Sequence, residues 1–340
     1  MIVFIGIRES IPVFVFRLQG AIWICALFNL SQKEYYLTHH NDFVGYQSMK
    51  RYALVICLLG AHLAQADGTQ TGMVRVAAIQ CPSVMGKTAE NIRNITNLVR
   101  QAASMGARVV VLPECSVQGY LEPITWTSWS STGTDGMDVR QVAESVPGPS
   151  TTLFGKLADE LNIYLCVGLI EAGTNGFFNA QVLLSPEGKL LAHHRKKALW
   201  TPGDSSWCTP GDRPIQVVKT EFGNMGLMIC YDFHALPQYL AKRQADLVLY
   251  SVGWYGPNEK SWFSKSFPSK AVIPYNFHVI AANWSSPTEA DEWPGRGHSC
   301  IITREGKVLA MSEKVSGNAI VIADLEIRKR ESQTPKDTAR

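Results

Sequence analysis

From about Val74 onward, short apolar runs alternate with segments of helical periodicity. The runs VRVAAIQC, RVVVLPEC, YLCVGLIE and DLVLYSV predict buried strands. Between the first two, Ile95, Leu98 and Ala102 recur at helical spacing, and we expect a helix capped by Thr88 and stopped at Gly106. This alternation predicts one layered α/β domain, near the upper size for a single core.

The composition is that of an ordinary globular protein. Of 340 residues, 46% are hydrophobic and 18% charged, with a net charge of +3, so neither a nucleic-acid nor an anionic membrane partner is indicated. Eight cysteines occur, without a CxxC pair or a Cys/His cluster at zinc-ligand spacing, so we expect no structural metal. Most of them lie in apolar runs, which is typical of reduced core cysteines.

The first 66 residues contain a pattern typical of a secretory signal peptide. The basic triplet MKR at residues 49–51 precedes an apolar segment at 52–63 and an Ala-Gln-Ala site at 64–66. We therefore expect a signal peptide at residues 49–66, with translation starting at Met49. Residues 1–48 would then be a non-native upstream extension, and residues 67–340 an exported domain, secreted or periplasmic, with its core at about 74–326.

A membrane anchor is the alternative for this N-terminal region. Residues 11–30 are apolar, but Arg17 inside the run counts against insertion. The apolar segment at 52–63 is too short to span a membrane, which takes about 20 residues. We expect no stable membrane insertion of the mature chain.

The stretch GLMICYDFHALP, residues 226–237, places a cysteine where a buried strand ends and a helix begins. A helix N-terminus at that point would favour the thiolate and lower the pKa of Cys230 into the range of about 3.5–7.5. The alternative is that Cys230 is a small buried hydrophobe, as most free cysteines are.

Two further apolar runs end in a carboxylate, Glu114 and Glu171, and a basic run, HHRKK, follows another strand. Strand ends in layered α/β folds open into the ligand crevice. A carboxylate there could take the proton of a thiol, the thiolate could attack a carbonyl or nitrile carbon, and an ammonium could stabilise the developing charge. A buried structural ion pair and a solvated basic edge are the alternatives.

Two other site types fit the sequence less well. His234, His278 and His298 could pair with a cysteine as in papain-like proteases, but no local protease signature surrounds Cys230. The chain has no GxxxxGK[ST] phosphate loop.

Several motifs, in this order, resemble those of the nitrilase, or carbon–nitrogen hydrolase, superfamily. They are VVVLPECSVQGY, VGLIEAGTNGFFNAQVLL, HHRKKALW, GLMICYD and GRGHSCIITREGKVLA. The resemblance implies Glu114 as the base, Lys196 as the catalytic lysine with Lys197 as the alternative, and Cys230 as the nucleophile. It also implies Glu171 as a second catalytic glutamate and Asn179 as a substrate-binding residue.

The resemblance further implies a four-layer α-β-β-α sandwich, a homodimer or higher homo-oligomer, and no metal or organic cofactor. Tyr-Asp after the nucleophile is more similar to the amidase branches than to true nitrilases. We therefore expect hydrolysis of a small amide or N-carbamoyl compound through a cysteinyl thioester. Tyr120 and Trp254 would line the pocket, and the amide of Tyr231 would be a second oxyanion donor.

Two other functions remain open at this point. One is conversion of a nitrile to an acid and ammonia, and the other is a catalytically silent binding or scaffold protein. Where many amidase members have an arginine soon after the nucleophile, this chain has Phe233 and His234, so a carboxylate clamp is not expected there.

Overall fold

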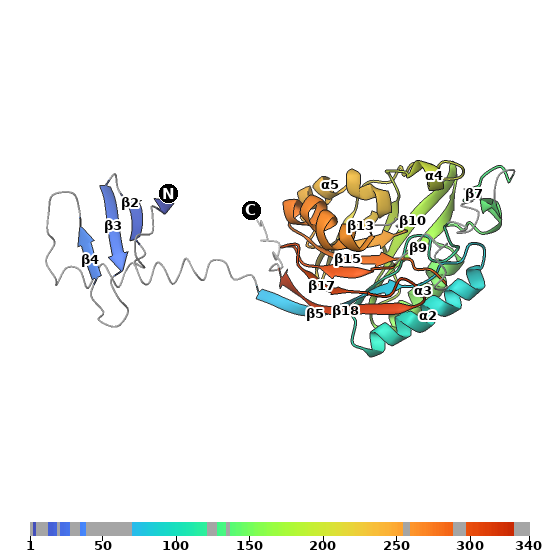
Figure 1. Cartoon of the computed structure of the whole chain (residues 1–340), viewed down its shortest axis with the longest axis horizontal. Helices are drawn as coiled ribbons and strands as arrows, with labels where there is room; N and C mark the ends of the chain where they lie inside the picture. The colour runs from blue at the N-terminus through green and yellow to red at the C-terminus, as the bar shows by residue number, and fades with distance from the viewer. Residues whose placement is uncertain are drawn as a thin grey trace, which may run out of the picture. The chain divides into compact units, whose positions relative to one another are not determined.

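The computed structural model describes residues 3–4, 13–18, 21–27, 35–38, 70–120, 128–133, 137–253, 259–287 and 297–329 (Figure 1). The chain divides into two compact units, Met1–Gly68 and Thr69–Arg340. The signal peptide expected at 49–66 lies outside the described residues, as does Trp254. Within the described part of the chain, no helix is long and apolar enough to cross a membrane.

The first unit contains a four-stranded antiparallel sheet in the order β1-β2-β3-β4. Its strands are β1 Val3–Phe4, β2 Val13–Leu18, β3 Ala21–Leu27 and β4 Tyr35–Thr38. Nothing in our reading of the sequence predicted this sheet.

The second unit contains two six-stranded sheets. The order of the first is β11-β10-β9-β6-β5-β18, and that of the second is β12-β13-β14-β15-β16-β17. The first comprises β5 Gln70–Gln80, β6 Val109–Val111, β9 Tyr164–Gly173, β10 Gly176–Leu184, β11 Leu190–Arg195 and β18 Ala319–Lys329. The second comprises β12 Val217–Thr220, β13 Gly223–Ile229, β14 Leu247–Val252, β15 His278–Asn283, β16 Cys300–Ile302 and β17 Val308–Met311.

Helices cover the outer face of each sheet (Figure 1). The long helices α2 Thr88–Ser104 and α3 Pro149–Leu161 pack on the first sheet through one apolar cluster. The short helix α5 Pro237–Lys242 and the π-helices η3 Trp262–Ser266 and η4 Pro268–Val272 pack on the second sheet through another. A third cluster fills the space between the sheets. The predicted four-layer α-β-β-α sandwich is thereby confirmed.

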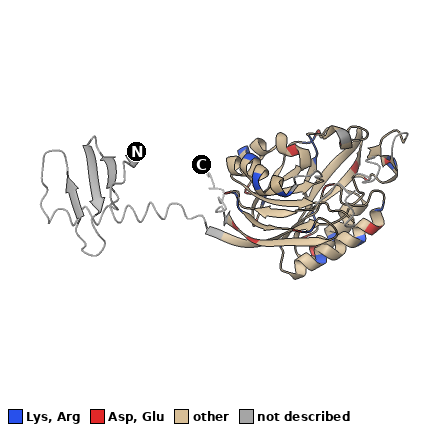
Figure 2. Cartoon of the chain, in the orientation of Figure 1, with Lys and Arg blue, Asp and Glu red and all other residues tan. Residues whose placement is uncertain are grey.

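Charged residues are distributed unevenly over these layers (Figure 2). Lys and Arg gather on the helices around α5, whereas α2 carries Glu90 in its first turn and two arginines, Arg93 and Arg100, further along. The remaining short elements of the second unit are β7 Trp129–Ser130, β8 Met137–Asp138, η1 Val139–Gln141, α4 Thr201–Asp204, η2 Cys230–His234, α6 Glu259–Ser261 and η5 Ile273–Tyr275.

The predicted start of α2 is wrong by one residue. The N-cap is Lys87, and Thr88 is the first helical residue, with its buried hydroxyl lacking a hydrogen-bond partner. The predicted stop at Gly106 is correct, because this glycine adopts φ +89°, a left-handed conformation that costs glycine little.

The parallel strands set the position of the site. In the first sheet β6 runs parallel to β5 and β9, and in the second β14 runs parallel to β13 and β15. Parallel strands present their carboxyl ends at one edge of a sheet. Glu114 follows β6, Cys230 directly follows β13, and Gly253 directly follows β14.

Candidate active site

Glu114 is fully buried beyond the end of β6. Its amide donates to the carbonyl of Val252, at the end of β14 in the second sheet, over 3.3 Å. Oε1 accepts from Nζ of Lys196 and from Nδ2 of Asn179, each at 2.7 Å. Oε2 has no hydrogen-bond partner, so one oxygen is positioned and the other is available to accept a proton.

Lys196 follows the last residue of β11 and has no exposed side-chain surface. Its Nζ lies 2.7 Å from Oε1 of Glu114 and 2.8 Å from Oδ2 of Asp204. Burial alone would lower the pKa of Lys196, but Asp204 and Glu114 raise it well above its ordinary value. The amine therefore stays protonated and forms a fixed positive charge in a site from which water is excluded.

Asp204 is the site residue that sequence reasoning missed. It is fully buried at the end of α4, where Oδ1 accepts from the hydroxyl of Tyr120 at 2.8 Å and Oδ2 from the amide of Trp200 at 2.7 Å. The segment TPGD has the composition of a turn, and no apolar strand precedes it. The carboxylates at the ends of apolar strands are visible in the sequence pattern, and Asp204 is not among them.

Cys230 is the first residue of η2 and adopts φ +39°, a left-handed backbone conformation that is uncommon for a residue with a side chain. Its carbonyl accepts from the hydroxyl of Tyr250 at 2.8 Å, and its sulfur accepts from the amide of Gly253. A sharp strand-to-helix turn was expected here, and these two hydrogen bonds hold it.

The expected lowering of the thiol pKa is wrong for the resting site. Burial and the charge of Glu114 raise the pKa of Cys230 well above its ordinary value, although Lys196 and the Gly253 amide oppose them. The five residues of η2 also form too short a helix to supply a strong dipole. The thiol is therefore protonated at rest and requires a base to release its proton.

Gly253 brings the sulfur and the free carboxylate oxygen together. Its amide contacts the sulfur of Cys230, and a Cβ added to Gly253 would lie only 2.7 Å from Oε2 of Glu114 and 3.4 Å from the ring of Tyr120. A side chain at this position would therefore fill the space between nucleophile and base. The absence of a side chain keeps that space open.

The structure gives Glu171 a different set of contacts. Its carboxylate binds Arg195 through two hydrogen bonds of 2.6 and 2.8 Å and binds His193 at 2.7 Å. Burial would raise its pKa, but the hydrogen bonds from Arg195 and His193 lower it. Among the described residues no hydrogen bond or ion pair joins Glu171 to Glu114, Lys196 or Cys230. Its contacts instead fix Arg195, the neighbour of Lys196 on β11, and a catalytic role for Glu171 stays a prediction.

The other predicted residues are placed as follows. Asn179 and Tyr120 orient Glu114 and Asp204 through their side chains, and the Tyr120 ring lies 5.5 Å from Nζ of Lys196. The side chain of Tyr231 is 37% exposed. A role of the Tyr231 amide as oxyanion donor and any substrate contact of these residues stay predictions.

Lys197, the alternative catalytic lysine, faces elsewhere. Its Nζ donates to the carbonyl of Gly211 at 3.0 Å, and its backbone amide donates to Asp232. Lys196 alone of the two therefore pairs with the buried carboxylates in the structure.

Comparison with known proteins supplies the family. The sequence matches the carbon–nitrogen hydrolase family over residues 75–333, more than half of the chain. The chain belongs to the carbon–nitrogen hydrolase family. It is an amidase-like member of the nitrilase superfamily and carries the family's Glu-Lys-Cys triad, as the sequence predicted.

Relatives of this carbon–nitrogen hydrolase include amidases and a nitrilase. It is 30% identical over 268 residues to omega-amidase NIT2 of Homo sapiens, covering 75% of this chain and 89% of the human protein. It is 25% identical over 285 residues to nitrilase 2 of Arabidopsis thaliana, covering 75% of this chain and 81% of the plant protein. The structure of an amidase from Nesterenkonia sp. has the same fold, with a TM-score of 0.62 at 22% identity over 74% of this chain and 90% of that one.

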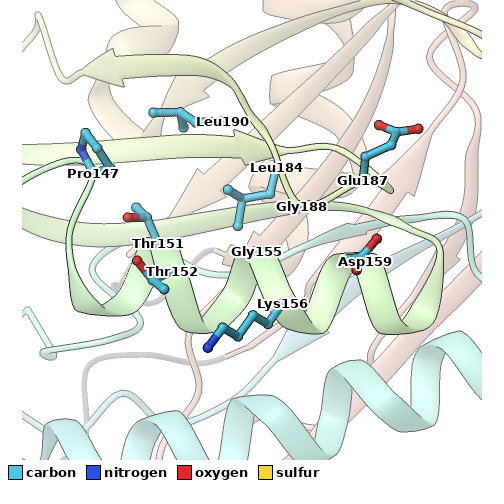
Figure 3. Close-up of a pocket in the computed structure, with 10 residues that line it drawn as sticks. All are labelled: Pro147, Thr151, Thr152, Gly155, Lys156, Asp159, Leu184, Glu187, Gly188 and Leu190. Carbon is cyan, nitrogen blue, oxygen red and sulfur yellow. The ribbon is translucent and has the colours of Figure 1, made fainter.

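A surface hollow of about 360 Å³ lies elsewhere, between α3 and the turn that joins β10 to β11 (Figure 3). Lys156, Asp159 and Glu187 are among the residues that line it, and none of the triad residues does. Among the residues that line the hollow there is neither a cysteine nor a histidine, and the hollow is separate from the cluster of Glu114, Lys196 and Cys230.

Proposed function

We propose that the protein hydrolyses the amide or N-carbamoyl C–N bond of a small molecule through a cysteinyl thioester, with release of ammonia or an amine. One arrangement carries the proposal. The charged amine of Lys196 lies between two buried carboxylates, and both the thiol of Cys230 and the free oxygen of Glu114 lie next to Gly253. These groups supply a base, a nucleophile and an electrophilic cation in one enclosed space.

The residues would act in sequence. Oε2 of Glu114 accepts the proton of Cys230 as the sulfur attacks the carbonyl carbon, and the ammonium of Lys196 stabilises the negative charge that develops on the oxygen. The protonated Glu114 then gives the proton to the leaving nitrogen, and the thioester forms as the C–N bond breaks. Water attacks the thioester with Glu114 as base again, which releases the acid and restores the thiol.

A panel of small amides, carbamoyl compounds and nitriles tests this proposal by ammonia or amine release. We expect turnover of an amide or carbamoyl compound, complete loss of that turnover in Cys230→Ala, and accumulation of a Cys230 acyl adduct detectable by mass spectrometry in wild type. Turnover of nitriles alone would favour the nitrilase alternative. Inert behaviour toward every compound would favour the scaffold alternative.

We also propose that the protein is exported. The support is the order of basic, apolar and Ala-Gln-Ala segments at 49–66. Mass spectrometry of the mature protein's N-terminus tests it, with a start near residue 67 as the expected result. A start near Met1 would contradict export by this signal and favour an N-terminal anchor.

A homodimer is a further proposal, supported by exposed apolar side chains on the helical layer over the second sheet. Tyr239 is 42% exposed and Ile273 is 52% exposed. Light scattering coupled to gel filtration gives the mass, and a monomer at micromolar concentration would contradict the proposal.

A further inference from the structure

Asp232 is a fully buried carboxylate two residues after the nucleophile, and all its contacts come from donors. Oδ1 accepts from the backbone amides of Lys197 at 2.9 Å and Ala198 at 2.8 Å. Oδ2 accepts from the amide of Ile229 at 3.2 Å and from Nε2 of His194 at 2.7 Å. Hydrogen bonds to an ionised acceptor are shorter and stronger than neutral ones, so this carboxylate fixes each donor firmly.

The four donors belong to the two segments that carry the reacting groups. Lys197 and Ala198 directly follow Lys196 at the end of β11, in the first sheet. Ile229 directly precedes Cys230 at the end of β13, in the second sheet. Asp232 thus joins the backbone beside the catalytic lysine to the backbone beside the nucleophile, across the two sheets.

His194 supplies the fourth donor from β11, the strand that ends one residue before Lys196. The His194 side chain is 2% exposed, so its hydrogen bond to Asp232 is shielded from solvent. The His194 ring therefore satisfies a buried acceptor, Oδ2 of Asp232, and links Asp232 to β11 in addition to the two backbone amides.

We propose that Asp232 and His194 are positioning residues that set the separation between Nζ of Lys196 and the sulfur of Cys230, and through it the rate of thioester formation. Neither side chain contacts the triad side chains in the hydrogen bonds described above. A misplacement of about 1 Å between reacting groups can cost about 10²-fold in rate. Substrate binding depends less on this separation than the chemical step does.

Asp232→Asn is the first test, and it rests on the proposed amide hydrolysis for its turnover readout. In this variant an NH2 group replaces one carboxylate oxygen and cannot accept a hydrogen bond. The two N–H groups that donated to that oxygen then face another donor. We expect kcat to fall by about 10²-fold with KM within about threefold of wild type. Asp246→Asn is the matched control, because Asp246 is 3% exposed and accepts from the amide of Asn224 at the opposite end of β14. An equal loss of kcat in both variants would overturn the proposal.

Two substitutions of His194 test the pair with Asp232 in place. In His194→Gln the side-chain amide can supply an N–H at the position of Nε2, whereas His194→Leu supplies none. We expect the glutamine variant to retain at least about a third of kcat, and the leucine variant to lose about tenfold or more. Equal rates in two variants that both fold, as judged by circular dichroism, would overturn the proposal.

Alkylation of Cys230 by iodoacetamide, followed by peptide mass spectrometry, requires no amide substrate. If Asp232 acts through Lys196, Asp232→Asn should slow alkylation about tenfold in the wild-type background and should not change it further in Lys196→Ala. Additive effects would overturn the proposal. Should this pattern hold while wild type hydrolyses no amide, the proposed function would fail and the positioning role would stand.

Discussion

Lys196 lies between two carboxylates, Glu114 and Asp204, and all three side chains are fully buried. Removing one partner from a group of buried charges leaves an uncompensated buried charge. The resulting loss in the free energy of unfolding exceeds the net stabilisation that the intact group provides. The amine of Lys196 thus has two roles. It balances the charges of Glu114 and Asp204 in a buried site, and it provides a positive charge that can stabilise a developing oxyanion.

The two lysines of the basic run are expected to differ in function. Lys196→Ala should lower kcat/KM by about 10²–10³-fold, because one preformed oxyanion donor is removed. Lys197→Ala should stay within about twofold of wild type, since its ammonium contacts only the carbonyl of Gly211 among the described residues. Steady-state kinetics on the best amide of the panel measures both, and wild-type activity in the first variant would reverse the assignment.

The acid limb of the pH–rate profile should report Glu114. Burial and the charge of Asp204 raise the pKa of this carboxyl, while Lys196 lowers it, and the net shift is upward. A base works only when deprotonated, so activity should be lost as the pH falls through a value above the ordinary glutamate pKa of about 4.3.

Asp204→Asn provides the control for that assignment. It removes a negative charge that raises the pKa of Glu114, so the acid limb of kcat/KM should move to lower pH even though the rate itself falls. An acid limb that stays in place would show that another group titrates.

The sequence singled out Glu114, Lys196 and Cys230, which the structure brings to one place, because each directly follows an apolar run or lies in a recognisable motif. Sequence reasoning missed Asp204, which lies in a turn-like TPGD segment, and Asp232 with His194, whose partners are distant in the chain. It also predicted the wrong direction for the pKa of Cys230, because the extent of burial cannot be read from a local pattern.

At the scale of elements, the strand positions and the two ends of α2 were predictable to within a few residues, whereas the short helices after Cys230 were not. The apolar runs coincide with β5, β9, β13 and β14 to within a few residues. The helix expected directly after Cys230 is divided: the 3-10 turn η2 begins at Cys230, and α5 follows from Pro237. Hydrogen bonds from Tyr250, on the next strand β14, and from Gly253, which directly follows it, hold this early turn.

The start of β15 should make the fold sensitive to acid. Burial and the charge of Arg304 lower the pKa of His278 to about 4. In the unfolded chain the ring binds a proton from about pH 6.5 downward, so its contribution to stability is present above that pH and is lost as the pH falls toward 4. We expect a loss of about 2 kcal/mol in the free energy of unfolding between pH 7 and pH 5.

Urea unfolding at the two pH values measures this loss. His278→Gln removes the titrating ring and should reduce the difference between pH 7 and pH 5 by the same amount, whatever its effect on stability at pH 7. An unchanged difference in the variant would show that other groups cause the acid sensitivity.

At the scale of the molecule, the second unit holds its own sheets and its own core. A buried polar link also joins its two sheets: Nε2 of Gln181 on β10 donates to Oγ of Ser251 on β14 at 2.8 Å, and Ser251 donates to the carbonyl of Leu112 at 2.7 Å. The layer order was predictable only through the family resemblance, since periodicity does not specify how strands are ordered in a sheet.

A chain that begins at residue 67 should therefore fold and work. It retains the whole of β5, which pairs with β18 from Gln70↔Lys329 to Gln80↔Ala319. We expect its kcat/KM to be within about twofold of the full chain and its Tm within a few degrees. A large loss of Tm measured by calorimetry would show that residues 1–66 contribute to the stability of the second unit.

The enclosure of the Glu114–Lys196–Asp204 group has a consequence for the conditions under which the enzyme works. Mobile ions screen exposed charges within a Debye length of about 10 Å at 0.1 M ionic strength, but they cannot enter a space without solvent. Added sodium chloride should thus leave the chemical step on an uncharged amide unaltered.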